Sequence, residues 1–127
     1  MNENEIAKET VDAALKIHRS LGPGLLESVY DVVLAKELET RGLRIQRQVP
    51  VPIKYEGLIF EEGFRTDIIV EDKVILELKS VENMTAVHRK QLQTYLRLTG
   101  LKLGLLLNFG ASLMKDGIVR AVNGLEE

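Results

Sequence analysis

The chain has 127 residues, of which 45% are hydrophobic and 28% are charged, and its formal net charge is −2. This length and composition predict one globular domain over residues 1–127. The absence of cysteine excludes disulfide frameworks, thiolate zinc sites and cysteine nucleophiles, and the acidic balance disfavours binding of nucleic acid through a broad basic surface. No apolar run approaches the ~18 residues of a membrane span, and the acidic N-terminus is unlike a signal peptide, so we expect a cytoplasmic protein that does not bind membranes.

Two helices are expected in the first third of the chain. Apolar residues recur at helical spacing from about Ile6 to Leu21, and the break Gly22-Pro23-Gly24 follows. A second helix is expected from about Leu25 to Arg41. Apolar side chains cover much of its surface, which predicts a well-buried helix.

After these helices the pattern alternates as in strands. Leu43–Tyr55 is expected to be an edge strand or two short strands, because Pro50 and Pro52 cannot donate ladder hydrogen bonds. Leu58–Phe60 is a short strand candidate that is not counted in the order of elements. The remaining expected elements are strands at Phe64–Val70, Val74–Ser80, Lys102–Phe109 and Ile118–Val122, and a helix over about Thr85–Thr99. The apolar run that ends at Phe109 predicts a strand buried on both faces. The order α-α-β-β-β-α-β-β predicts an α/β fold in which helices flank a central mixed sheet with one parallel crossover.

Two neighbouring expected strands carry charges among apolar residues. Alternation places Glu77 and Lys79 on one face of the second strand, where burial costs several kcal/mol per charge unless each is paired or binds an ion. If the intervening turn has three residues, Asp67 lies opposite Glu77. Two carboxylates in that position repel, and a divalent cation between them would turn repulsion into binding. A two-residue turn would instead place Asp67 opposite Leu76.

The residue types of this hairpin indicate two possible roles. Two carboxylates suit Mg²⁺ or Mn²⁺, which activate water and neutralise charge on a phosphoryl group. Lys79 could then orient the attacking water or stabilise the phosphorus centre. Alternatively, the hairpin lies at the surface and Lys79 pairs with Asp67 or Glu77. The spacing by itself is compatible with both.

Asp67, followed after nine residues by Glu77-Leu78-Lys79, resembles the PD-(D/E)XK nuclease superfamily. Thr66 stands where that name has a proline, a departure that touches no ligand. The segment from Gly24 to Tyr30, Gly-Leu-Leu-Glu-Ser-Val-Tyr, is similar to the signature of the GxxExxY protein family, a bacterial and archaeal group placed in that superfamily.

A later segment extends the resemblance. His88, Gln91 and Tyr95, followed by Leu96-Arg97-Leu98-Thr99-Gly100, are also similar to the GxxExxY family. The spacing of Gln91 and Tyr95 is similar to the QxxxY element of RecB-type nucleases. Together the motifs cover about residues 8–124.

The resemblance implies a role for each matching residue. Asp67 and Glu77 would be metal ligands, Lys79 the catalytic lysine, and Glu27 a further carboxylate that acts directly or through water. Gln91 and Tyr95 would line the site, and His88 and Tyr30 would support it.

From the residues alone, purely structural roles are also possible for the matching residues outside the charged hairpin. Glu27 is also a favourable carboxylate for the first turn of a helix, and Tyr30 is typical of a core side chain with a bonded hydroxyl. His88, Gln91 and Tyr95 lie on one helix face, which could be a solvated stripe. The basic residues that could contact phosphates are equally typical of a solvated face; they are Arg65, Arg89, Lys90 and Arg97.

The resemblance implies Mg²⁺-dependent (or Mn²⁺-dependent) hydrolysis of phosphodiester bonds by a metal-activated water, most plausibly in DNA, by a protein that can form a homodimer. A competing hypothesis is a catalytically silent domain of the same fold that binds nucleic acid or a protein. A third is an oligomeric structural protein that uses the apolar run Leu101–Phe109 at an interface, although a central strand is the simpler interpretation of that run.

Overall fold

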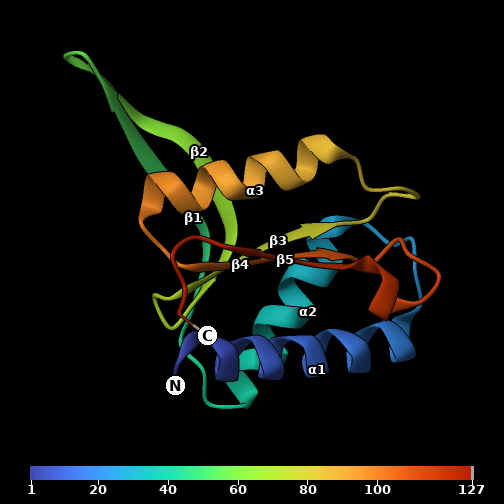
Figure 1. Ribbon diagram of the computed structural model, residues 1–127. Coiled ribbons are helices and arrows are strands. Elements are labelled where there is room, and N and C mark those ends of the chain that lie inside the picture. The colour runs from blue at the N-terminus through green and yellow to red at the C-terminus, as the bar shows by residue number, and fades with distance from the viewer. Residues whose placement is uncertain (127) are drawn as a thin grey trace.

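A mixed five-stranded sheet lies between two helices on one face and one helix on the other (Figure 1). The computed structural model describes residues 1–126. Its elements are α1 (Glu3–Leu21), α2 (Glu27–Thr40), β1 (Ile45–Tyr55), β2 (Leu58–Val70), β3 (Val74–Lys79), α3 (Ala86–Thr99), β4 (Leu103–Asn108), the 3₁₀ helix η1 (Met114–Gly117) and β5 (Ile118–Val122). This order and the α/β class confirm the prediction.

The strands lie in the sheet in their order along the chain, from β1 to β5. Only β3 and β4 are parallel, and α3 connects them, as expected for a crossover. The prolines of β1 predicted its place at an edge, and it is an edge strand. Every residue of β4 is buried, which confirms the prediction for the apolar run.

The hairpin of β1 and β2 is longer than expected. The segments Leu58–Phe60 and Phe64–Val70 belong to one strand, β2, because pairing with β1 continues to Tyr55↔Leu58 at the tip. The outer half of this hairpin extends beyond the helix layers (Figure 1). The tip turns at Glu56 and Gly57, both with positive φ. The sequence did not predict this projection, because apolar side chains there indicate burial, which does not occur.

The prediction that α2 is well buried was wrong in part. The helix begins at Glu27, so Leu25 and Leu26 precede it and are exposed. Within the helix, Val29 and Val32 are also exposed. The reason is that α2 packs on α1 and the sheet along one stripe only, and the apolar side chains off that stripe face outwards.

Two hydrophobic clusters hold the layers together. The larger one joins α1 and α2 to the sheet, and the smaller one joins α3 to the opposite face through Ile75, Leu92 and Leu96. A Cβ on Gly104 would lie 2.8 Å from Leu92 Cδ1, so glycine permits the close approach of α3 to β4. Helices long and apolar enough to cross a membrane do not occur among residues 1–126.

Candidate active site

The turn between β2 and β3 decides which residues face each other. Val70 pairs with Val74 and Ile68 with Leu76, so the turn spans residues 71–73 and has the three-residue length that brings Asp67 opposite Glu77. The β2–β3 pairing ends there, whereas β3 continues beside β4 to Lys79. The two carboxylates therefore lie where β2 and β3 separate.

Carboxylates occupy the edge of β3 that β2 has left. The backbone N–H of Leu78 donates to Asp67 Oδ2 at 2.8 Å, and that of Ser80 donates to Glu27 Oε2 at 3.3 Å. Residues two apart in a strand direct their N–H groups to the same edge, so these side chains replace the missing ladder partners. In addition, Asp67 N–H donates to Glu77 Oε1 at 3.3 Å.

Burial and mutual repulsion disfavour ionisation of this pair. Burial raises the pKa of Asp67, with a further rise from the charges of Asp31 and Glu27. Burial, and then the charge of Asp67, raises the pKa of Glu77 to about 8. Lys79 opposes both shifts. The pair thus lacks sufficient positive charge of its own, which is the condition under which a bound cation would be stabilising.

Lys79 is half-buried at the end of β3. The ion pairs among residues 1–126 do not include Lys79 with either Asp67 or Glu77. The surface-hairpin interpretation required such a pair, together with an exposed Glu77, and Glu77 is only 8% exposed. Lys79 is near enough to influence both carboxylates without neutralising either.

A cleft of about 370 Å³, the carboxylate cleft, lies between α2 and the separating strands. Its lining includes Glu27, Asp31, Arg47, Gln48 and Asp67. Asp31 is 5% exposed and accepts hydrogen bonds from Arg47 Nε and Gln48 Nε2, both at 2.7 Å. Gln48 adopts φ 52°, a conformation that is costly for a residue with a side chain and that tends to occur near functional sites.

Sequence reasoning missed Asp31, Arg47 and Gln48. One signal was available: Asp31 lies four residues after Glu27 on the same face of a helix, directly after the core residue Tyr30. The two partners on β1 carry no comparable signal.

The three predicted residues of α3 differ in their distance from the carboxylate pair. Burial raises the pKa of the Tyr95 hydroxyl, and the charges of Glu77 and Asp67 raise it further, so Tyr95 lies near the pair. Gln91 is exposed one turn earlier on α3. His88 accepts from Thr85 N–H through Nδ1 at 3.3 Å and caps α3.

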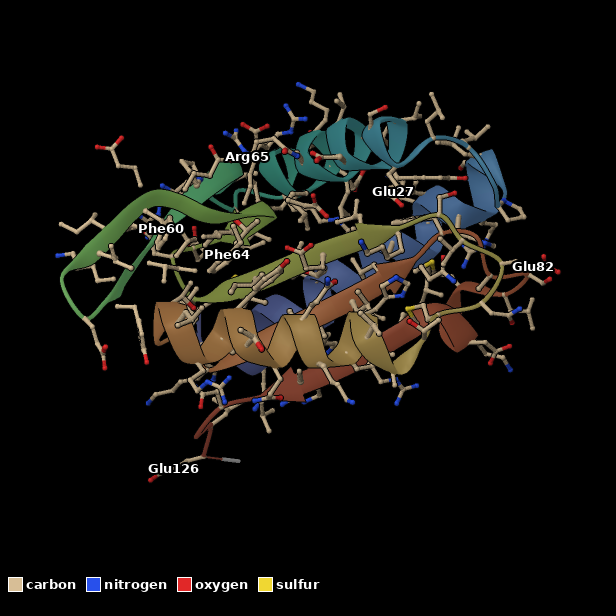
Figure 2. The ribbon with its side chains drawn as sticks, turned by 90° about the horizontal axis from the view of Figure 1, so that it is seen from above. Glu27, Phe60, Phe64, Arg65, Glu82 and Glu126 are labelled. Atoms are coloured by element: carbon tan, nitrogen blue, oxygen red, sulfur yellow. The ribbon has the colours of Figure 1, made fainter. Side chains whose placement is uncertain are left out.

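Tyr30 is fully buried, and its ring stacks on Phe109 with centroids 4.3 Å apart. Its hydroxyl donates to the Gly22 carbonyl at 2.6 Å and accepts from Leu25 N–H at 3.1 Å. Tyr30 therefore ties down the loop from which α2 begins, and in this way it positions Glu27. Figure 2 shows Glu27 beside the end of the yellow-green strand β3.

The residues expected to hold a metal come together only in part. Asp67 and Glu77 are adjacent, but the described residues contain no group of three His, Asp or Glu side chains arranged to hold an ion. Glu27 instead accepts a hydrogen bond from Ser80 N–H just after the end of β3, so the expected set of three carboxylates is not preformed. Two hard oxygen donors beside open space still fit a cation such as Mg²⁺ that retains several waters.

Paired carboxylates and a lysine at an open strand edge of a mixed α/β sheet are features of nuclease-type proteins. A family model described as the PD-(D/E)XK nuclease superfamily matches residues 4–121, and the chain belongs to this superfamily. The crystal structure titled "Crystal structure of SSO0001" is similar with a TM-score of 0.53 and 20% sequence identity, a likeness of fold alone. The match covers 78% of this chain and 50% of that chain, so this chain spans about half its length. No curated protein matches the sequence.

Proposed function

We propose that this protein is a Mg²⁺- or Mn²⁺-dependent nuclease that hydrolyses phosphodiester bonds, most favourably in DNA. The observation that carries the proposal is the pair of half-buried Asp67 and buried Glu77, which has a neighbouring lysine but no ion pair among the described residues. Superfamily membership supports the same class of activity, since these nucleases typically use divalent metals.

The chain's own residues would have different roles in the reaction. Asp67 and Glu77 would hold the cation directly, and Glu27 would contact it through water. The bound cation would supply Lewis-acid activation of water and of the phosphoryl group. Lys79 would place an ammonium next to the scissile phosphate, where it stabilises developing negative charge. The guanidinium group of Arg47, which lines the carboxylate cleft, would bind a neighbouring phosphate.

Cleavage assays test this proposal directly. Purified protein with Mg²⁺ or Mn²⁺ should cut plasmid or oligonucleotide DNA, and Asp67→Ala and Lys79→Ala should not. Matched controls are Asp72→Ala and Lys73→Ala, which change the same residue types in the exposed turn of the same hairpin and should retain activity. Cleavage that survives both site substitutions would refute the proposal.

A catalytically silent domain that binds nucleic acid or a protein is the second candidate. It is favoured by the lack, among residues 1–126, of a preformed three-residue metal site. Calorimetric titration with Mn²⁺ separates the two. A nuclease should bind Mn²⁺ at a site that Glu77→Ala abolishes, whereas a silent domain should show no such site.

The proposal has four finer parts. We assign the chain to the GxxExxY group because Gly24, Glu27 and Tyr30 lie around one tethered loop. Residues 1–127 would act as a single domain, in the cytoplasm, and as a homodimer. Light scattering of the purified protein tests the dimer.

A further inference from the structure

The outer part of the β1–β2 hairpin, residues 53–63, is here called the arm. It projects from the layers, and Figure 2 shows Phe60 farther along it than Phe64. Tyr55 is 64% exposed and Phe60 is 54% exposed, and the neighbouring Leu58 and Ile59 are exposed as well. A two-stranded hairpin cannot bury its own apolar faces, so contiguous exposed side chains of this kind mark a binding surface.

One face of the arm looks into a second cleft. Ile53 pairs with Phe60 and Tyr55 with Leu58, and alternation puts these four side chains on one face. Ile53 also lines a cleft of about 370 Å³ between the arm and α3, here called the arm cleft. A Cβ on Gly63 would collide with the Ile53 side chain, so this glycine lets Ile53 lie across the arm.

The lining of the arm cleft differs in charge from that of the carboxylate cleft. It contains Lys90 and, among the described residues, no carboxylate. Phe64 and Tyr95 form its aromatic wall, stacked with centroids 4.1 Å apart and planes 2° apart. The arm's own acids, Glu56, Glu61 and Glu62, lie outside the lining, and Glu62 is paired with Arg65 at 2.6 Å. The chemistry therefore suits an anionic ligand that carries flat, apolar groups.

Tyr95 lies between the arm cleft and the candidate active site. This side chain lines the cleft with its ring and feels the charges of Glu77 and Asp67 at its hydroxyl. A ligand in the arm cleft would therefore lie next to the carboxylate pair.

The aromatic residues are divided between the core and the region of the arm. The chain has three phenylalanines, three tyrosines and no tryptophan. Tyr30 and Phe109 stack on each other in the core, and the other four lie at the arm or at its root.

We propose that the arm and α3 bind the unpaired nucleotides of a single nucleic-acid strand, with bases stacked on Tyr55 and Phe60, and lead that strand to Asp67 and Glu77. Unpaired bases offer free π-faces, whereas bases inside a duplex are already stacked on each other. The inference rests on the proposed function in that it names the substrate class of the same site.

Fluorescence anisotropy tests the inference without requiring cleavage. The probes are a labelled oligothymidine of about 20 nucleotides, longer than the ~4–16 nucleotides that single-strand sites cover, and a duplex of equal length. The protein is full-length Lys79→Ala with Mn²⁺, so that a cleaving enzyme leaves the probes intact. The single strand should bind more tightly than the duplex. Phe60→Ala and Tyr55→Ala should each weaken single-strand binding by roughly 5-fold to 100-fold.

Phe60→Leu separates stacking from general apolar contact, because leucine keeps much of the apolar area that alanine would lose and removes the ring. It should lose as much affinity as Phe60→Ala, and Phe60→Trp should retain affinity. Leu113→Ala, at an exposed position on the 3₁₀-helix side of the molecule, is the matched control and should have no effect.

Several results would overturn the inference: no binding of the single strand, binding of duplex as tight as that of single strand, or a Phe60→Leu protein that binds like its parent. A Phe60→Ala protein that changes its mass in light scattering and still binds the single strand would assign the arm to a second copy of the chain. Failure of the proposed function is distinguishable, because wild-type protein would then cleave no DNA while the anisotropy pattern persists.

Discussion

Two buried carboxylates on either side of Asp67 have opposite surroundings. Asp31 is 5% exposed and Glu77 is 8% exposed. Asp31 accepts two hydrogen bonds of 2.7 Å from Arg47 and Gln48, and one of them is an ion pair. Glu77 accepts one bond of 3.3 Å from a backbone N–H and faces another carboxylate. Similar burial therefore accompanies an ion-paired acid in one place and an acid without a counter-charge in the other, and the partners decide which acid is available to a cation.

The largest expected effect comes from making the same near-isosteric change to both acids. Glu77→Gln should lower cleavage by about 100-fold or more, because it removes a proposed metal ligand and its charge. Asp31→Asn should lower cleavage by less than about tenfold, because Asp31 already has partners. Steady-state cleavage rates with Mg²⁺ measure both. Equal losses would show that Asp31 also takes part in the reaction.

The pH dependence of stability should reveal that Glu77 is buried without a counter-charge. The pKa of Glu77 is raised in the folded state to about 8, above its value of 4.5 in an unfolded chain. The folded state therefore binds more protons between these values, and stability should fall as the pH rises from about 5 to about 8. Glu77→Gln should remove up to about 4 kcal/mol of this loss. Urea unfolding in EDTA measures it.

The control for this measurement is Glu61→Gln, a change to an exposed acid of the arm. It should leave the slope of stability against pH unchanged. A wild-type protein whose metal-free stability is constant from about pH 5 to about pH 8 would contradict the raised pKa of Glu77.

Removing the counter-charge of Asp31 should make it resemble Glu77. Arg47→Met leaves Asp31 buried with one partner, and should lower the free energy of unfolding by about 1–3 kcal/mol, less than for a fully buried pair because Arg47 is partly exposed. Urea unfolding near neutral pH measures the loss. In the double variant Asp31→Leu/Arg47→Met most of this loss should disappear, since no charge is left unpaired. Additive losses would mean that the ion pair is not coupled.

The smallest effect concerns the loop before α2. Tyr30→Phe preserves the ring stack on Phe109 but removes the hydroxyl that bonds Gly22 and Leu25. The free energy of unfolding should fall by about 1 kcal/mol. Tyr55→Phe, at the exposed arm, is the matched control and should be neutral. If Tyr30→Phe is also neutral, the hydroxyl does not hold this loop.

Local patterns predicted the paired hairpin because its contacts are close in sequence. The three-residue turn after Val70 sets the register, and register together with alternation determines that Asp67 and Glu77 oppose each other. The edge position of β1 followed from Pro50 and Pro52 in the same way. These are consequences of backbone geometry within a few residues.

Local sequence patterns could not predict contacts between segments that are far apart in the chain. Asp31 meets Arg47 and Gln48 only because α2 crosses the inner part of β1, and Gln48 reaches Asp31 from a backbone conformation that its residue type does not favour. The projection of the arm could not be predicted either, because its local pattern points to the wrong environment. Its apolar residues indicate burial, and only the packing of the other elements leaves them outside.

The sequence by itself determined the α/β class and the order of the elements, and it placed Asp67 opposite Glu77 on the condition of a three-residue turn. The tertiary structure decided that Glu27 bonds Ser80 in place of completing a three-carboxylate set, and that Asp31 forms an ion pair whereas Glu77 does not. The physical reason is that the ionisation of a buried acid depends on which charges lie within a few ångströms of it. For Asp31 that charge comes from Arg47 on β1, in another part of the sequence, whereas for Glu77 the charges come from Asp67 and Lys79 of the same hairpin.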